Sequence, residues 1–208
     1  MALFPFFKEI EGAKGLIVGG GKVALRKAEK MLPYGPRLTI IAPEILPEFY
    51  NMDITIIKRS FHSSDITKDL EFVIAASDNG EQNKQIYLLC QEKNIPVNVV
   101  DQPKYCTFMF PALIKRGNLS VGISTSGASP SAAIWLKEEM EQILPDEMEE
   151  ILEWLQKQRV IVKDQIHEEA ARSHCLKELF LQCLEEKGPL NDGMRDQILN
   201  MERKDHEK

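Results

Sequence analysis

Three consecutive glycines between an apolar run and a helical pattern constrain the fold of this chain more than any other feature. Gly15-Leu16-Ile17-Val18 is a short apolar run typical of a buried strand, and Gly19-Gly20-Gly21 ends it. Apolar residues then recur at helical spacing from Lys22 to Leu32, and the pattern stops before Pro33. The sequence therefore predicts a buried strand, a tight glycine turn and a helix in direct succession.

The glycine turn also has the spacing of a phosphate-binding motif. Residues 19–24 fit the pattern G-x-G-x-x-A, in which Gly19 allows the chain to reverse. Gly21 leaves bare backbone for a pyrophosphate, and the small Ala24 allows the helix to pack closely on the strand. The free N–H groups and the positive dipole end of the helix would hold the phosphates. A glycine-rich turn without a ligand is the alternative, but its position directly after a strand favours a dinucleotide.

The first hundred residues alternate between strand-like and helical segments. Runs rich in β-branched residues follow at 38–42, 54–57, 72–76 and 97–100, and a helical stretch at 81–93 separates the last two. Apolar strands that alternate with helices predict a parallel sheet covered on both faces. We therefore expect an α/β fold with a Rossmann-type, NAD-binding sheet domain over residues 1–113.

The pattern changes after this domain. Segments 108–114 and 119–124 flank a predicted turn, and alternating apolar residues in the second segment predict an antiparallel hairpin with one buried face. Ser129-Pro130 is a good start for a helix that we expect to reach about residue 144. We assign residues 114–145 to this segment. One short helix is not enough to cover the apolar face of the hairpin.

The last third of the chain is helical and acidic. Residues 146–208 carry 16 acidic and 10 basic side chains, whereas residues 1–145 carry 16 of each, so the net charge of −6 lies in the last third. We expect a small helical domain at 146–208, broken at Gly188-Pro189 and followed by an irregular tail. Trp135 and Trp154 fall within helical patterns and are expected to be packing residues. Neither part has the basic footprint of a nucleic-acid-binding protein.

Several classes of protein are disfavoured by composition. No apolar run approaches the roughly 18 residues of a membrane span, and the first residues lack the pattern of a secretory signal. No C-x-x-C pair occurs among the cysteines, so neither a zinc ribbon nor a disulfide framework is indicated. His167 and His174 have no carboxylates at metal-ligand spacing, so we predict no metal site. We expect a cytoplasmic protein.

Two acidic residues follow strands of the predicted sheet. Glu44 follows the second strand, where such folds place a carboxylate on the ribose hydroxyls, and no Arg or Lys closely follows Ala42 to bind a 2′-phosphate. NAD is therefore favoured over NADP. Asp101 follows the last parallel strand, where it would face the cofactor and accept a proton. An aspartate that only caps a turn before Pro103 is the other interpretation, and it stays open.

Taken together, the motifs resemble the precorrin-2 dehydrogenase family, which includes the amino-terminal half of fused siroheme synthases. The residues that carry the resemblance are Ile17 to Lys27, Ile41 to Glu44, Ala75 to Asn79, Asn98 to Lys104, Phe108 to Ala112 and Ser124 to Pro130. The resemblance extends to about residue 140, and the acidic last third matches only in length and helical character.

The resemblance implies oxidation of precorrin-2 to sirohydrochlorin with NAD, and it places Asp101 on the catalytic aspartate of the family. Cofactor contacts are expected at Gly19, Gly21, Lys22, Val23, Ala24, Pro43, Glu44 and Ser77. Carboxylates of the substrate are expected near Lys104, Ser124 and Ser129, with Lys115 and Arg116 as further candidates. For the hydroxyls from Ser124 to Ser129, a plain helix cap is an equally good interpretation.

The resemblance also implies a homodimer built through the segment after the nucleotide domain. Because this chain ends near residue 208 without a methyltransferase half, we expect a separate uroporphyrinogen methyltransferase to act upstream. Some members of the family also insert ferrous iron. Two alternatives therefore remain, a bifunctional dehydrogenase and ferrochelatase, and a non-catalytic NAD-binding redox sensor.

Overall fold

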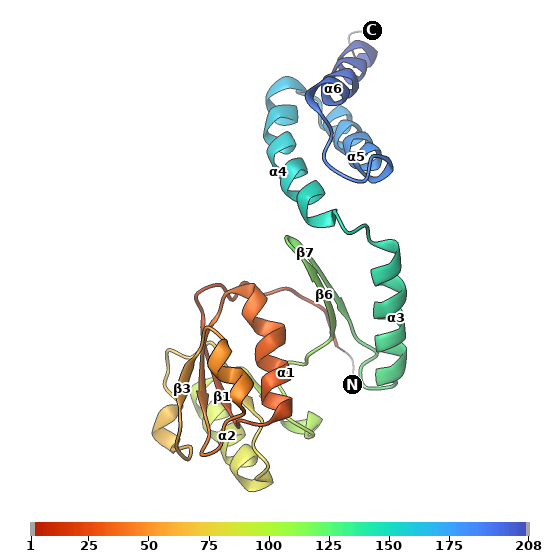
Figure 1. Cartoon of the computed structure of the whole chain (residues 1–208). Helices are drawn as coiled ribbons and strands as arrows, with labels where there is room; N and C mark the ends of the chain where they lie inside the picture. The colour runs from red at the N-terminus through yellow and green to blue at the C-terminus, as the bar shows by residue number, and fades with distance from the viewer. Residues whose placement is uncertain (1–2, 207–208) are drawn as a thin grey trace. The chain divides into compact units, whose positions relative to one another are not determined.

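The computed structural model describes residues 3–206, with side chains through residue 201 (Figure 1). The chain divides into two compact units, one over Phe4–Phe110 and the other from Pro111 onward. Each unit has its own hydrophobic core, so each is described separately.

The first unit is built on one parallel sheet. Its strands run in the order β3-β2-β1-β4-β5 and are β1 (Lys14–Val18), β2 (Arg37–Ile41), β3 (Thr55–Ile57), β4 (Phe72–Ala75) and β5 (Val97–Val99). In the register, Ile17 of β1 lies beside Ile40 of β2 and Ile74 of β4. The predicted Rossmann-type parallel sheet is therefore confirmed.

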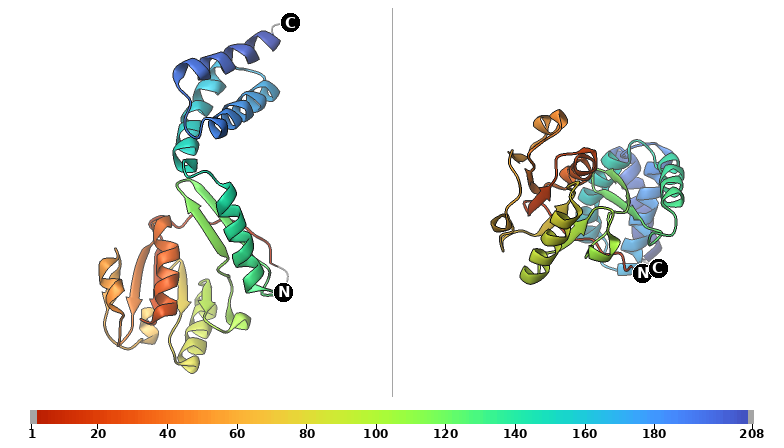
Figure 2. Two further views of the ribbon diagram at one scale, coloured as in Figure 1. Left: turned by 45° about the vertical axis from the view of Figure 1, so that its right-hand side comes forward. Right: turned by 90° about the horizontal axis from the view of Figure 1, so that it is seen from below.

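The two helices of this unit cover opposite faces of the sheet (Figures 1 and 2). Ile17 and its neighbours in register pack against buried residues of α1 (Lys22–Met31), among them Ala24. Alternate strand residues such as Val73 pack against α2 (Gly80–Lys93). Because strand side chains alternate between faces, a sheet that is covered on both sides needs the continuous apolar runs seen in the sequence.

Short 3₁₀ turns complete the first unit. They are η1 (Leu32–Tyr34), η2 (Pro47–Asn51), η3 (Ser63–Asp65) and η4 (Pro103–Tyr105). Three of them begin with proline at the first or second position, where the missing N–H has no intrahelical partner to lose.

The second unit begins with the predicted hairpin. Strands β6 (Ala112–Arg116) and β7 (Leu119–Ile123) pair antiparallel across a turn at residues 117–118, two residues shorter than the sequence suggested. Helix α3 (Pro130–Ile143) follows and contacts the hairpin. Trp135 is 57% exposed on α3, so the expectation that it packs in this chain's core is wrong.

Arg116 holds the end of α3. Its Nη1 donates to the carbonyl oxygens of Leu144 at 3.0 Å and Pro145 at 2.7 Å. The guanidinium thus satisfies carbonyl groups at the helix end that have no intrahelical partner. This bonding commits Arg116 to the fold, so it is not a free cation for substrate carboxylates.

The remaining helices form a separate core. They are α4 (Met148–Gln165), α5 (Glu169–Glu185) and α6 (Asp192–His206), and they bury residues such as Ile151, Leu179 and Leu199. The expected irregular tail is wrong, because α6 continues to the end of the described chain and Leu199 is 3% exposed. Among the described residues, no helix is both long and apolar enough to cross a membrane.

Candidate functional site

The glycine turn between β1 and α1 requires two glycines for its shape. Gly19 has φ +124°, and a Cβ there would overlap the carbonyl oxygen of Ala76. A Cβ at Gly20 would overlap the carbonyl oxygen of Glu44. The motif predicted the need for Gly19 but treated Gly20 as a free position, because the contact with the loop after β2 depends on tertiary structure.

Gly21 differs from the other two glycines. It is the N-cap of α1 in extended conformation, and none of the described atoms would lie within 4 Å of a Cβ at this position. Within the described chain no side chain caps this helix, so its first N–H groups are free to bind an anion. Ala24, one turn further on, is fully buried. The turn thus has room for a pyrophosphate and free N–H groups to bind it, and contact of Gly21 with a cofactor stays a prediction.

The loop after β2 is bound to the glycine turn by its backbone. Leu46 N donates to the Gly20 carbonyl oxygen at 3.0 Å, and Gly19 N donates to the Ile41 oxygen at 3.0 Å. Pro43 and Glu44 are exposed on this loop. Their position at the end of β2 is the one expected for contacts with an adenosine ribose.

Two cations, Lys58 and Arg59, follow the neighbouring strand β3, whose last residue Ile57 pairs with Ile41 at the end of β2. Arg59 donates through both terminal nitrogens to the carboxylate of Asp65, at 2.8 and 2.7 Å. This bidentate pairing holds the pKa of Asp65 below its usual value. Arg59 is therefore engaged by Asp65, and its charge is already balanced.

At the end of β4, Ser77 is fixed by a residue that the sequence did not single out. Ser77 Oγ donates to Asn83 Oδ1 at 2.7 Å, and Asn83 Nδ2 donates to the Ser77 carbonyl oxygen at 2.8 Å. Asn83 is 3% exposed, so a buried side chain fixes the loop that follows β4. Asn79 caps α2 by accepting from the Glu81 and Gln82 amides. In the sequence, Asn83 is one polar residue among several in a helical pattern, and its burial became visible only in the structure.

Asp101 lies in a turn with an unusual backbone. Its φ is +58°, and the turn from Val99 to Gln102 closes with a 3.4 Å hydrogen bond from Gln102 N. Left-handed backbone is uncommon outside glycine, although aspartate and asparagine adopt it more often than other residues. The Cys106 thiol supports the turn, because its Sγ accepts from Val99 N and donates to Val99 O, both at 3.2 Å.

These segments meet around one cavity of about 480 Å³. Its lining comes from the start of α1, the ends of β4 and β5 and the start of α2, and it includes Gly21, Lys22, Val23, Ser77 and Asp101. The chain leaves β1 and β4 in opposite directions at this edge, which is where open α/β sheets bind ligands. Of the predicted cofactor residues, Gly19, Ala24, Pro43 and Glu44 do not line this cavity.

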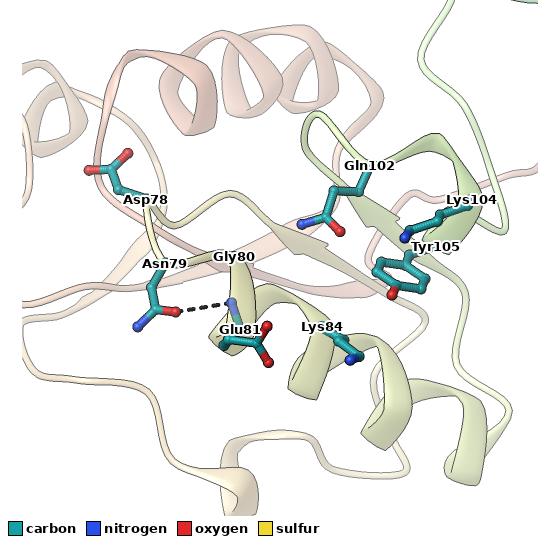
Figure 3. Close-up of a pocket in the computed structure, with 8 residues that line it drawn as sticks. All are labelled: Asp78, Asn79, Gly80, Glu81, Lys84, Gln102, Lys104 and Tyr105. Atoms are coloured by element: carbon teal, nitrogen blue, oxygen red, sulfur yellow. Dashed lines mark hydrogen bonds between the residues drawn. The ribbon is translucent and has the colours of Figure 1, made fainter.

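A second, open groove of about 850 Å³ lies beside α2 (Figure 3). It is lined by both acidic and basic residues, among them Glu81, Lys84 and Lys104. Lys104 Nζ lies 4.7 Å from the ring centre of Tyr105, and that ring stacks on Tyr87. Lys104 is thus exposed next to the turn that carries Asp101.

The predicted serines belong to the second unit. Ser129 is the N-cap of α3, where its Oγ accepts from Ala132 N at 3.1 Å. Ser124 Oγ accepts from Ser126 N at 3.2 Å. Both hydroxyls therefore support the local turn, and each retains a proton to donate. Contact with a substrate stays a prediction for both.

Lys27, four residues after the cavity-lining Val23, is a further charged residue that the spacing arguments did not single out. It lies on α1 and is largely covered, with Nζ 4.0 Å from the centre of the Phe110 ring. Burial lowers its pKa from 10.5 to about 8.

The parallel sheet, the glycine turn and the cavity at its switch point define a dinucleotide-binding protein. Residues 6–112 match the model of a family described as putative NAD(P)-binding. This match spans more than half of the chain, and the chain belongs to that family.

Curated relatives match beyond this domain. A siroheme synthase 2 of Aeromonas salmonicida is 41% identical over 147 residues, which cover 70% of this chain and 30% of the relative. A siroheme synthase of Acinetobacter baylyi is 33% identical over 198 residues, which cover 93% of this chain and 43% of the relative. This chain thus spans less than half of the length of the curated relatives it matches.

A solved structure shares the fold. The protein described as SirC, precorrin-2 dehydrogenase, superposes with a TM-score of 0.67 at 20% identity, over 97% of this chain and 100% of that chain. The extra helices after the nucleotide domain are therefore part of the shared architecture.

Proposed function

We propose that this protein oxidises precorrin-2 to sirohydrochlorin with NAD. The observation that carries the proposal is that the free N-terminus of α1 and the carboxylate residue Asp101 line the same cavity. The similarity to siroheme synthases and to a precorrin-2 dehydrogenase supports this choice of substrate.

The residues of this chain divide the work between binding and proton transfer. The first N–H groups of α1, left uncapped at Gly21, would hold the pyrophosphate of the dinucleotide. The chemistry that NAD would supply when bound is a hydride acceptor for the tetrapyrrole. The oxidation also releases one proton, which Asp101 accepts as general base. Its turn, supported by Cys106, holds the carboxylate at the edge of the cavity.

The test of this function is the absorbance of the tetrapyrrole during incubation with precorrin-2, with and without NAD. We expect sirohydrochlorin to form only with NAD, and the Asp101→Asn protein to form it roughly 10²-fold more slowly or worse. Near-normal turnover by a folded Asp101→Asn protein would support the turn-capping interpretation instead. No turnover by the wild-type protein that binds NAD would favour the redox sensor. Ferrous or cobaltous ions added afterwards test chelation.

NAD is the proposed cofactor rather than NADP. Glu44 lies in the loop after β2, and of the two cations after the neighbouring strand β3, Lys58 and Arg59, the guanidinium of Arg59 is engaged by Asp65. A carboxylate binds ribose hydroxyls but repels a 2′-phosphate. We expect faster turnover with NAD at matched concentrations, and Glu44→Ala should narrow the difference. Equal or better turnover with NADP would overturn this preference.

We propose that the chain has a nucleotide domain at 1–113, a dimerisation segment at 114–145 and a helical domain at 146–208. The dimerisation segment forms the interface with a second copy of the chain. On α3, Ile134, Trp135 and Ile143 are 53%, 57% and 77% exposed, which is a large apolar surface for one short helix. Sedimentation should show a dimer at micromolar concentration, and a species of 23.7 kDa alone would contradict it. A uroporphyrinogen methyltransferase activity would supply the substrate.

A further inference from the structure

The groove beside α2 and the cavity at the switch point share part of their lining. Asp78, Gly80 and Gln102 line both, and every residue that lines the groove belongs to the first unit (Figure 3). Asp101 lines the cavity and is followed directly by Gln102, so a ligand in the groove adjoins the turn that carries the proposed proton acceptor. The groove volume of about 850 Å³ is within the range of pockets for sizeable small molecules.

Two lysines line this groove without a carboxylate partner. Lys84 comes from α2 and Lys104 from η4, and both residues are exposed. Asp78 and Glu81 line the same groove, but among the described residues neither lysine forms an ion pair with them or with another carboxylate. Both ammonium groups are therefore available to the carboxylates of a ligand.

Aromatic packing joins the two elements that carry these lysines. The ring of Tyr105 in η4 stacks on the ring of Tyr87 in α2, with ring centres 4.8 Å apart. Lys84 precedes Tyr87 by three positions, so the two side chains lie on one face of the helix. Lys104 Nζ lies 4.7 Å from the centre of the Tyr105 ring. The groove thus presents positive charge from two elements that are fixed to each other.

We propose that this groove binds the tetrapyrrole substrate by its peripheral carboxylates, with Lys84 and Lys104 as the two cations that hold them. The inference rests on the proposed function and deepens it, because the sequence marked Lys104 alone and did not single out Lys84. A tetrapyrrole is a wide ring with carboxylates around its edge, so cations on two elements hold it at two points. Its side nearest Gln102 then lies beside the turn of Asp101.

Fluorescence titration of the full-length protein with uroporphyrin, a stable tetrapyrrole with acetate and propionate side chains, tests the groove without turnover. Lys84→Met and Lys104→Met should each weaken binding about three- to fivefold, and the double variant about tenfold or more. Lys84→Arg and Lys104→Arg keep the charge and should bind nearly as well as the wild type. Added salt should weaken binding to the wild type more than to the double variant. Wild-type affinity in the double variant, or no binding of uroporphyrin to the wild type, would overturn the proposal.

Two control variants separate the groove from the rest of the surface. Lys68→Met removes an exposed lysine of the first unit that lines neither the groove nor the cavity, and it should leave uroporphyrin binding unchanged. Glu81→Gln removes a negative charge from the groove and should tighten binding. If Lys68→Met weakens binding as much as Lys84→Met, the attraction belongs to the whole surface and the proposal fails. NAD affinity should be the same in all variants, because neither groove lysine lines the cavity.

Steady-state kinetics with precorrin-2 and NAD distinguish this proposal from the proposed function. The double lysine variant should raise KM for precorrin-2 and change kcat at saturation little, since the lysines hold carboxylates that do not react. An unchanged KM would refute the groove as the substrate site and leave the proposed function intact. Absence of dehydrogenation in a wild-type protein that binds NAD would instead refute the proposed function, while the uroporphyrin titration still reports whether the two lysines bind a tetrapyrrole.

Discussion

Replacing Lys27 with methionine should stabilise the folded protein at neutral pH. In the folded state the pKa of Lys27 is about 8, against 10.5 for the free side chain, so folding disfavours the ammonium. At about 1.36 kcal/mol for each pKa unit, the difference between the two pKa values corresponds to a loss of roughly 3 kcal/mol in the free energy of unfolding, as an upper limit. Solvent that reaches the exposed part of the side chain and the lost contact with the Phe110 ring reduce the expected gain to about 1–2 kcal/mol.

The expected gain in stability of Lys27→Met over the wild type should decrease as the pH rises. Between about pH 8 and 10.5 the unfolded chain binds the Lys27 proton while the folded chain has released it. Wild-type stability therefore gains a rising contribution from Lys27 over this window, and the penalty is fully present below it. The advantage of Lys27→Met should accordingly be largest near neutral pH and should shrink steadily towards pH 10.5.

Urea unfolding followed by far-ultraviolet circular dichroism measures this advantage at a series of pH values. Lys30→Met is the matched control: it removes an exposed lysine three residues away on α1, and because Lys30 disfavours the Lys27 ammonium, it should raise stability by much less than Lys27→Met does. If Lys27→Met is destabilised at neutral pH, or if its advantage does not change with pH, the ammonium is not penalised by burial and this reasoning is wrong.

Two other predictions concern backbone and capping. Gly21→Ala should leave the stability unchanged, because its Cβ meets open space, but it should weaken NAD binding measured by calorimetry. Gly19→Ala should destabilise the fold by several kcal/mol, because φ +124° and the overlap with backbone atoms both oppose a Cβ there. Equal effects of the two glycine variants on stability would contradict this. Arg116→Met should destabilise the second unit by about 1–3 kcal/mol in urea, because carbonyls at the end of α3 lose a charged donor; an unchanged midpoint would show that water replaces it.

Local patterns were sufficient to predict the first unit. Continuous apolar runs predicted a sheet buried on both faces, and the glycine spacing predicted the turn into α1. Both signals arise within about ten residues of chain, so they survive without knowledge of tertiary contacts. The position of Asp101 at the cavity followed in the same way, from the rule that parallel strands end at one edge.

The missed features depend on contacts between distant segments. Gly20 is required by the loop after β2, Asn83 by Ser77, and the depth of Lys27 by Phe110. The last helix was missed for a different reason. Charged residues dominate its sequence, and a few apolar side chains such as Leu199 are enough to fix it on the core of α4 and α5.

Asp101 allows the demands of folding and of chemistry to be separated at one position. Its left-handed backbone favours glycine and asparagine over alanine. Between glycine and alanine the difference is about 1–2 kcal/mol, and the greater flexibility of glycine in the unfolded chain offsets part of it. Stability measured in urea should therefore rank Asp101→Gly and Asp101→Asn near the wild type and Asp101→Ala below them. Dehydrogenation should fall by roughly 10²-fold or more in all three, because each lacks the carboxylate. If activity instead follows the stability ranking, the aspartate serves its turn rather than the substrate.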